Sequence, residues 1–229
     1  MPPRGGQPPT ILAFDSSGPH VAVVLHRARA LDLRCEATER GQAERLIPLM
    51  RAVLAGAGIG WRDLDALAVG TGPGNFTGTR IAVAAARGLA LGLGLPAIGI
   101  SALEAALDPD RPPPGPALAS IPAPHGRAIV QPMRAGLPAG PARMIDPAAP
   151  PPDLAHGPEL LVHGHRAAEI AARLGATAAP PAEGPAVLRI AALAARRLVA
   201  HRPGDRPAPV YLRPPDATPP SDPPPEHLP

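Results

Sequence analysis

The prolines of this chain are concentrated in one part of the sequence. Of 37 prolines in 229 residues, only eight lie within residues 1–107, and the other 29 follow. Proline fixes its backbone φ angle and has no amide hydrogen to donate, so it interrupts helices and central strands. We therefore expect an ordinary globular unit in the first half of the chain and a reduced, loop-rich unit in the second.

Hydrophobic patterns in the first half predict alternating strands and helices. Strands are expected at 10–17, 20–26, 30–38, 64–70 and 96–100, and helices at 42–58, 76–93 and 101–107. Ser101 and Glu104 have the spacing of a capping box, which would begin the last of these helices. The order of these elements is that of an α/β layer unit.

The second half has fainter signals. They predict a strand pair at 116–121 and 127–133, a strand at 159–165, and helices at 166–175 and 186–202. The last helix is amphipathic, and we expect its buried face at Leu188, Ala191, Ala192, Ala195 and Val199. The expected organisation is a disordered tail at 1–9, an α/β half at 10–107, a reduced α/β half at 108–213 and a disordered, proline-rich tail at 214–229.

Composition and charge exclude several classes of protein. The chain has no lysine, its net charge is only +3, and no basic run interleaved with aromatic residues indicates direct binding of nucleic acid. Cys35 is the single cysteine, so no disulfide can form within the chain, and we expect it in the core of a cytoplasmic protein. The longest apolar run, 81–100, is interrupted by Arg87 and Pro96, which argues against a membrane span.

The glycine-rich stretch GTGPGNFTGTR, residues 70–80, has two interpretations. Its place between a strand and a helix suits a loop that binds phosphate, but the Walker motif needs a lysine and the dinucleotide motif needs other spacings. The alternative is a structural turn at Gly72, Pro73 and Gly74, with Asn75 or Thr77 as the helix cap. Gly78 would then allow close approach of another backbone segment. The residue chemistry favours the turn.

Several segments together resemble the TsaB family, also called YeaZ. They are ILAFDSSGPHVAVVL, QAERLIPLMRAVL, the segment GPGNFTGTRIAVAAARGLALGLGLPAIGISALEA from residue 72, and PVYLR at 209–213. The resemblance is specific within 10–107 and weak from 109 to 205. It implies an actin-like ATPase (ribonuclease H-like) fold of two α/β halves, the second reduced and rich in proline.

The resemblance also implies a function. TsaB-like proteins take part in forming threonylcarbamoyladenosine at position 37 of tRNAs that read ANN codons, as non-catalytic subunits. They pair with a TsaD-like catalytic subunit, a TsaE-like ATPase joins them, and they can form homodimers; tRNA is reached only through the complex. The pairing surface is formed by the first two helices, here expected at Leu46, Ile47, Leu49, Met50, Val53, Leu54, Phe76, Arg80 and Val83. The alternative is that these side chains belong to the core of the chain itself.

Candidate catalytic groups are few. Catalytic relatives hold a metal through two histidines four residues apart on one helix, and no two of the eight histidines here have that spacing. His163 and His165 are the closest pair, without an evident third ligand. We therefore expect no metal site, no catalysis and no firmly bound cofactor.

Asp15 leaves an alternative open. An aspartate at the end of the first strand lies near the nucleotide in actin-like folds, so weak nucleotide binding, or a small actin-fold ATPase or kinase, is the second hypothesis. The competing interpretation is that Asp15 and the serines after it only cap a hairpin turn.

The chain departs from the family pattern at several positions. Pro122 and Pro124 stand where family members carry Asp and Arg, Arg127 stands where they carry an acidic residue, and Gln42 replaces a histidine. The resemblance therefore says most about the first half.

Overall fold

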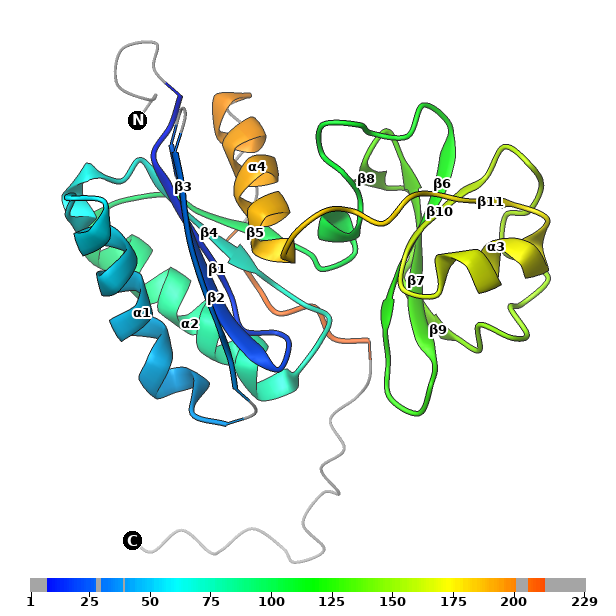
Figure 1. Cartoon of the computed structure of the whole chain (residues 1–229), viewed down its shortest axis with the longest axis horizontal. Helices are drawn as coiled ribbons and strands as arrows, with labels where there is room; N and C mark the ends of the chain where they lie inside the picture. Colours follow the sequence, from blue (N-terminus) through cyan, green and yellow to red (C-terminus); the bar gives the residue numbers. More distant parts are fainter. Residues whose placement is uncertain (1–7, 28–29, 39, 201–205, 213–229) are drawn as a thin grey trace, which may run out of the picture.

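The computed structural model describes residues 8–27, 30–38, 40–200 and 206–212 (Figure 1). The predicted tail at 214–229 and most of the predicted tail at 1–9 lie outside these residues. Within them the chain forms two β-sheets, one in each half, with helices packed against both. The mixed α/β class predicted from the sequence is confirmed.

The first sheet has five strands, in the order β3-β2-β1-β4-β5. They are β1 (Ile11–Asp15), β2 (His20–Arg27), β3 (Ala30–Ala37), β4 (Ala66–Gly70) and β5 (Ala97–Ile100). β2 and β3 run antiparallel to their neighbours, whereas β4 and β5 run parallel to β1 and to each other. Cys35, expected in the core, is exposed, because it lies on the edge strand β3.

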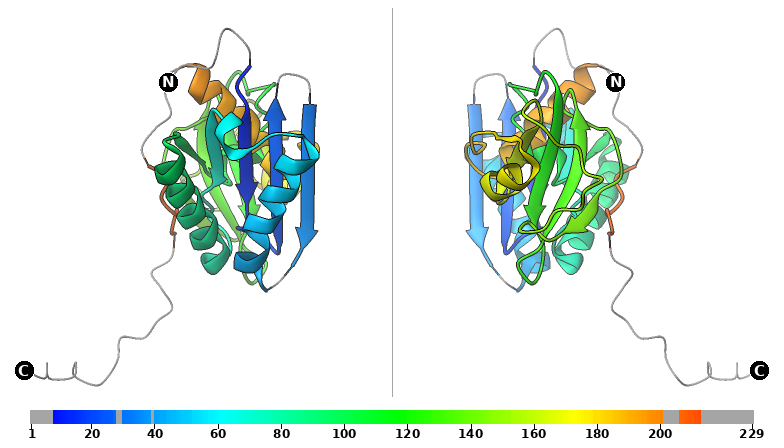
Figure 2. Two further views of the ribbon diagram at one scale, coloured as in Figure 1. Left: turned by 90° about the vertical axis from the view of Figure 1, so that its left-hand side faces the viewer. Right: turned by 90° about the vertical axis from the view of Figure 1, so that its right-hand side faces the viewer.

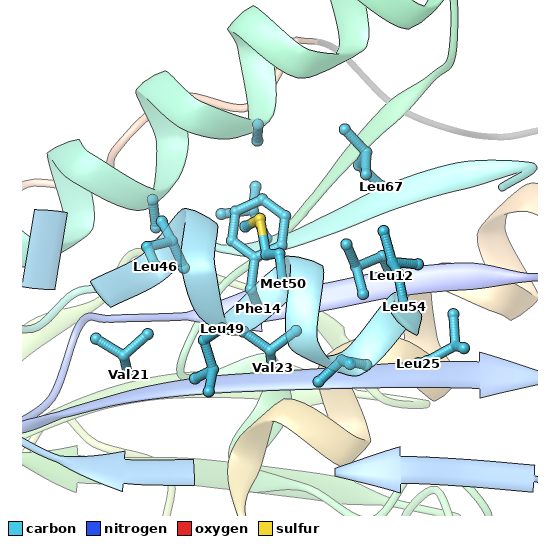
Figure 3. Packing of buried hydrophobic residues seen from close by; sticks show 14 of the residues in the cluster. Leu12, Phe14, Val21, Val23, Leu25, Leu46, Leu49, Met50, Leu54 and Leu67 are labelled. Carbon is cyan, nitrogen blue, oxygen red and sulfur yellow. The ribbon is translucent and has the colours of Figure 1, made fainter. Parts of the chain in front are cut away.

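Helices α1 (Gln42–Gly56) and α2 (Phe76–Leu93) cover one face of this sheet, as Figure 2 shows from the side. Leucine, valine and methionine side chains of α1 interlock with those of the strands beneath them, around Phe14 and Met50 (Figure 3). β1 and β4 are buried along their whole length, which explains why they read as continuous apolar runs.

The opposite face of the first sheet is covered by α4 (Ala186–Val199). The sequence placed this helix in the second half, but its buried side chains pack against β1, β2, β4 and β5. The predicted buried face is also wrong in part, since Val199 is exposed and the buried residues are Val187, Ile190, Ala191, Ala194 and Leu198. The helix is apolar around much of its circumference, so periodicity alone could not select the face.

The second sheet is built from shorter strands. They are β6 (Pro116–Pro122), β7 (Ala128–Arg134), β8 (Leu137–Pro138), β9 (Arg143–Ile145), β10 (Leu161–Gly164) and β11 (Thr177–Ala178). Their order is β11-β10-β6-β7-β8, with β9 also paired to β7. The helix α3 (Ala167–Leu174) packs on one face.

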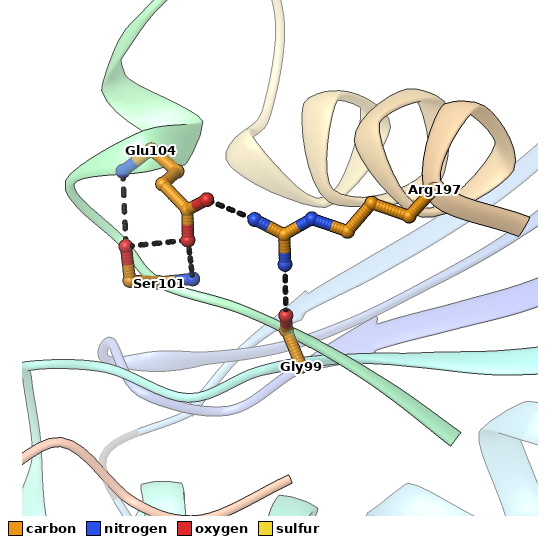
Figure 4. Close-up of polar contacts among 4 residues, drawn as sticks. All are labelled: Gly99, Ser101, Glu104 and Arg197. Atoms are coloured by element: carbon orange, nitrogen blue, oxygen red, sulfur yellow. Dashed lines mark hydrogen bonds and ion pairs between the residues drawn. The ribbon is translucent and has the colours of Figure 1, made fainter. Parts of the chain in front are cut away.

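Two 3₁₀ turns complete the fold, η2 (Trp61–Asp63) and η3 (Glu104–Ala106), and η3 joins the two halves. The predicted capping box is present there, because Ser101 N–H and Glu104 N–H each donate to the other residue's side chain. Arg197 of α4 pairs with Glu104 and donates to the carbonyl oxygen of Gly99 at 2.7 Å (Figure 4). This buried network fastens α4 to η3 and to β5.

Candidate functional site

The glycine stretch packs directly against the end of β1. A Cβ atom at Gly78 would overlap the carbonyl oxygen of Ser16, and one at Gly74 would overlap that of Ser17. Ser16 Oγ donates a hydrogen bond to the carbonyl oxygen of Gly78 at 2.8 Å. Glycine is therefore required at these two positions because the first turn of α2 lies against the backbone of residues 16 and 17.

Two amide groups at the start of α2 are engaged within the chain. Asn75 N–H donates to the Ser17 carbonyl oxygen at 2.6 Å. Gly78 N–H donates to Asn75 Oδ1 at 2.8 Å, so Asn75 is the helix cap, one of the two residues that the sequence offers for this role. Gly72 has a φ angle of 75°, and its peptide bond to Pro73 is cis. A phosphate loop needs free amide donors, so this geometry favours the structural turn.

The carboxylate of Asp15 also makes hydrogen bonds within the chain. Its side chain is almost fully buried, and it accepts hydrogen bonds from the amide and the hydroxyl of Ser17, each at 3.1 Å. His20 Nε2 lies 3.4 Å from Asp15 Oδ2, and the hydrogen bond to this carboxylate raises the pKa of His20. The carboxylate therefore closes the turn between β1 and β2, the second of the two roles considered for it.

A cleft of about 1110 Å³ separates the two halves. One wall is formed by the β1–β2 turn and the start of α2, and the other by β6, β7 and the residues after β10. The described end of the chain, residues 210–212, lines it as well. Most of the lining is apolar, and its polar groups include Asp15, His20, His165 and Arg189.

Most of the predicted partner patch is buried within the chain. Six of its nine side chains are buried in the core beneath α1 and α2, namely Leu46, Leu49, Met50, Val53, Leu54 and Val83. The apolar stripe is wide because α1 packs against both the sheet and α2, which buries more than one side of it. Ile47 is partly buried, whereas Arg80 and Phe76 remain exposed.

Phe76 and Arg80 form a cluster with Tyr211 at the mouth of the cleft. Arg80 Nε donates to the Tyr211 hydroxyl at 2.7 Å, and its guanidinium carbon lies 3.7 Å from the centre of the Phe76 ring. The two rings are 5.2 Å apart and tilted by 41°. This contact joins the PVYLR segment to the start of α2, although the two lie far apart in the sequence.

The outward face of α2 carries small residues. Ala84, Gly88 and Gly92 are exposed at helical spacing, and Leu91 beside them is 83% exposed. A Cβ atom at Gly88 or Gly92 would meet no other atom within 4 Å. Hydrophobicity patterns miss such a face because glycine and alanine contribute little to them.

The departures at residues 42, 122, 124 and 127 lie in two places. Pro122 ends β6, and Pro124 and Arg127 lie in the turn between β6 and β7, where His125 and Gly126 have φ angles of 57° and 70°. The two prolines line the cleft, and Arg127 is exposed. Gln42 begins α1 and is buried, with no hydrogen-bond partner for its Nε2 atom.

The histidines do not build a ligand cluster. His163 is buried on β10, and this burial lowers its pKa, whereas His165 lines the cleft. Among the residues that the structure describes, no three His, Cys, Asp or Glu side chains come together in a way that could hold a metal ion. No helix in the described part of the chain has both the length and the apolar character needed to cross a membrane.

Comparison with known proteins identifies the architecture. The family TsaD, tRNA N6-adenosine threonylcarbamoyltransferase, matches residues 35–132. YeaZ from Pseudomonas aeruginosa is 26% identical and has a TM-score of 0.60, over 89% of this chain and 100% of its own. A structure described as an uncharacterized protein from the same organism, similar to peptidase YeaZ, is 26% identical, with a TM-score of 0.66 over 90% of this chain and 100% of its own.

The chain is a TsaB/YeaZ-like protein. The similarity to YeaZ extends over nearly the whole chain, so the YeaZ-like fold includes both sheets of this chain. No curated protein sequence matches the chain.

Proposed function

We propose that this YeaZ-like chain is a non-catalytic subunit for threonylcarbamoylation of adenosine 37 in tRNAs that read ANN codons, acting in the cytoplasm. Likeness to YeaZ across nearly the whole chain, together with the match to the threonylcarbamoyltransferase family, supports this role. The observation that carries the non-catalytic part is that Asp15 and the amides of residues 75 and 78 are bonded within the chain. The groups that would handle a nucleotide serve the fold instead.

The proposed partner is a TsaD-like catalytic subunit, with a TsaE-like ATPase joining the pair and tRNA reached only through the complex. The outward face of α2 offers a surface for a second helix. Its small residues allow close approach of a partner backbone, and Leu91 supplies an exposed apolar side chain. In this proposal the TsaD-like subunit binds the outward face of α2. A homodimer formed through the predicted helices would use the same face and would therefore compete with that subunit.

The alternative is a small ATPase or kinase with nucleotide near Asp15. It needs the β1–β2 turn and the glycine stretch to release their mutual hydrogen bonds before a phosphate could enter. Asn75 N–H would have to leave the Ser17 carbonyl oxygen, at 2.6 Å the shortest backbone contact of this turn.

The test is size-exclusion chromatography with light scattering, after mixing the chain with the TsaD-type protein of the same genome. We expect a 1:1 complex, and we expect Gly88→Gln to abolish it. The new side chain meets no atom of its own chain, and replacing a helical glycine favours the helix by about 0.5–1 kcal/mol. Loss of the complex would therefore not come from unfolding.

Ala172→Gln is the matched control, because Ala172 is exposed on α3 in the second half. It should leave the complex intact. If no complex forms with the unaltered chain and isothermal titration shows that the chain alone binds ATP, the subunit role is wrong and the ATPase alternative replaces it.

A further inference from the structure

The first sheet ends at a strand whose outer side has no partner strand. β3 is the edge strand of this sheet, and no strand within the described residues pairs with its outer side (Figure 2). It is eight residues long, whereas the edge strands β8 and β11 of the second sheet have two residues each. An edge strand of this length presents a row of backbone donors and acceptors with which another strand can pair.

The outward backbone groups belong to the odd-numbered residues of β3. Thr38 N–H donates to the Pro19 carbonyl oxygen at 3.1 Å, which continues the register between β2 and β3. Along an antiparallel strand, successive residues direct their N–H and C=O groups to opposite sides. The even-numbered residues therefore face β2, and Leu33 and Cys35 direct their backbone groups away from the sheet.

One face of β3 carries exposed apolar side chains. Leu33 and Cys35 lie on the face of the sheet that α4 covers, because their partners on β2 belong to the cluster beneath that helix. Both side chains are nevertheless exposed, Leu33 to 37%, since the buried residues of α4 pack against β1, β2, β4 and β5. A second strand beside β3 would cover these two side chains.

The other face of β3 carries charges of both signs. Asp32 and Arg34 lie beside the end of α1, where a Cβ atom at Gly56 would be 3.3 Å from Asp32 Oδ2 and 4.0 Å from Arg34 Nη2. Within the described residues neither side chain has an ion-pair partner, whereas Glu36 on the same face pairs with Arg45 at 3.0 Å. Charges on an edge strand oppose pairing unless the second strand supplies opposite charges beside them.

β3 is complementary to a second copy of itself. When two identical strands pair antiparallel, only registers that set odd-numbered residues opposite odd-numbered ones match the outward backbone groups. Among these, the longest overlaps within Ala30–Ala37 centre on Leu33 or on Arg34. The register centred on Arg34 sets Asp32 against Glu36 of the second copy, and these charges repel. The register centred on Leu33 sets Asp32 against Arg34 of the second copy, and does so twice.

We propose that two copies of this chain pair through β3 in antiparallel orientation, with Leu33 opposite Leu33 of the second copy. The pairing joins the two first sheets into one continuous sheet, with two Asp32–Arg34 ion pairs on one face and the two Leu33 side chains in contact on the other. α2 packs against β1, β4 and β5, away from this edge. The contact therefore leaves the outward face of α2 free and does not depend on the proposed function.

Disulfide trapping in the full chain tests this register. Cys35→Ser removes the only native thiol, and Leu33→Cys places a new thiol where the two copies of one residue face each other. Hydrogen-bonded antiparallel pairs have Cα atoms about 5.5 Å apart, within the roughly 4.4–6.8 Å that a disulfide spans. We expect a disulfide-linked dimer under mild oxidation, measured by intact mass and non-reducing electrophoresis.

The native chain is the matched control, because Cys35 is also exposed and lies on the same strand and the same face as Leu33. In the proposed register the two Cys35 residues are offset by four positions, about 13 Å along the strands, which a disulfide does not span. We expect linkage through position 33 to be at least tenfold faster than linkage through Cys35. Equal rates, faster linkage through Cys35 or no linkage at position 33 would each overturn the proposal.

A charge exchange tests the pairing without an introduced thiol. Asp32→Arg or Arg34→Asp alone sets like charges against each other across the dimer, and each should lower the dimerisation constant at least tenfold. The double variant restores both opposite-charge pairs with their signs exchanged, so we expect dimerisation within about threefold of the native chain. Sedimentation equilibrium measures the constants, and circular dichroism reports whether each variant folds.

Arg173→Asp is the matched charge control, because Arg173 is exposed on α3 in the second half. It should leave dimerisation unchanged. A native chain that stays monomeric at its highest soluble concentration would contradict the pairing, as would single variants that dimerise as well as the native chain. Failure of the double variant to recover dimerisation would assign the contact to another surface and overturn the proposal as well.

Discussion

The first sheet has helices on both faces, α1 and α2 on one and α4 on the other, whereas the second sheet has one helix, α3, on one face. The other face of the second sheet packs against η3, neighbouring loop residues and Leu212. Within the described residues, the chain between β9 and β10 contains no helix, where the first half has α1 between β3 and β4. The second half therefore repeats the plan of the first with one layer reduced.

This difference shows where the stability of the molecule resides. The central strands of the first sheet are buried along their length, but the edge strands β8 and β11 are two residues long and exposed. The last helix of the chain leaves the second half to cover the first sheet. The stability of each half therefore depends on contacts with the other half.

The largest loss of stability is expected at two glycines, one in each half, that lie against the backbone at or next to the first strand of that half. A Cβ atom at Gly78 would overlap the Ser16 carbonyl oxygen, and one at Gly164 would overlap the Ser120 carbonyl oxygen. Because backbone cannot yield easily, Gly78→Ala and Gly164→Ala should each lower the free energy of unfolding by about 3 kcal/mol or more. Urea denaturation measures this.

Gly88→Ala is the control for the first of these variants, since it lies on the same helix with no atom near its would-be Cβ. It should raise stability by about 0.5–1 kcal/mol. If Gly78→Ala behaves like Gly88→Ala, the close contact between α2 and the end of β1 does not exist in solution, and the parallel between the halves fails.

Ile190→Ala tests whether the last helix belongs to the first half. Ile190 is buried against the first sheet, so its truncation should cost about 2–5 kcal/mol. The loss should be visible in the unfolding midpoint followed by fluorescence of Trp61, which packs against the core beneath α1. Val199→Ala, on the face that periodicity favoured, should change stability by less than about 0.5 kcal/mol because Val199 is exposed. A larger loss of stability for Val199→Ala than for Ile190→Ala would show that α4 does not pack against the first sheet through Ile190.

Arg197→Ala removes the link between α4 and η3. It leaves Glu104, a buried carboxylate, without its ion pair, and the Gly99 carbonyl oxygen without a donor. We expect a loss of about 2–3 kcal/mol in thermal or urea unfolding. Arg196→Ala breaks an exposed pair with Asp110 and a hydrogen bond to the Pro109 carbonyl oxygen, and it should cost less, about 1 kcal/mol. Similar losses for both variants would mean that the η3 junction contributes little.

The smallest effect concerns pH. The hydrogen bond to Asp15 raises the pKa of His20, so the protonated histidine is favoured in the folded state. Its stabilising contribution is fully present below the unfolded value of about 6.5 and is lost as pH rises through the raised pKa. Burial lowers the pKa of His26 and His163, which act in the opposite direction, so the contribution must be isolated by a variant.

His20→Asn should therefore destabilise the protein more at pH 5.5 than at pH 8, by less than about 1 kcal/mol because the side chain is partly exposed. Chemical denaturation at the two pH values measures the difference. A loss that is equal at both values would show that His20 acts through packing alone.

Much of the fold could be predicted because its signals are local. The strand and helix order of the first half, the Asn75 cap and the capping box at Ser101 depend on residues close together in sequence. The short strands β8, β9 and β11 were not predicted, since segments of two or three residues carry no periodicity.

The predicted partner patch shows a limit of pattern reading. The apolar stripe of α1 was correctly located, but its width was attributed to a partner when it reflects packing on two neighbours of the same chain. The exposed face of α2, with Gly88 and Leu91, has too little apolar character to be recognised from sequence. Periodicity identifies which residues avoid water and does not identify what covers them.

The sequence by itself determined the elements, the turn at the glycine stretch and the resemblance to TsaB/YeaZ, because each rests on neighbouring residues or on a contiguous motif. Only the tertiary structure decided that α4 covers the first sheet and that Tyr211 meets Phe76 and Arg80 at the cleft. The physical reason is that burial and hydrogen bonding are satisfied between segments more than a hundred residues apart, and such pairings leave no local pattern.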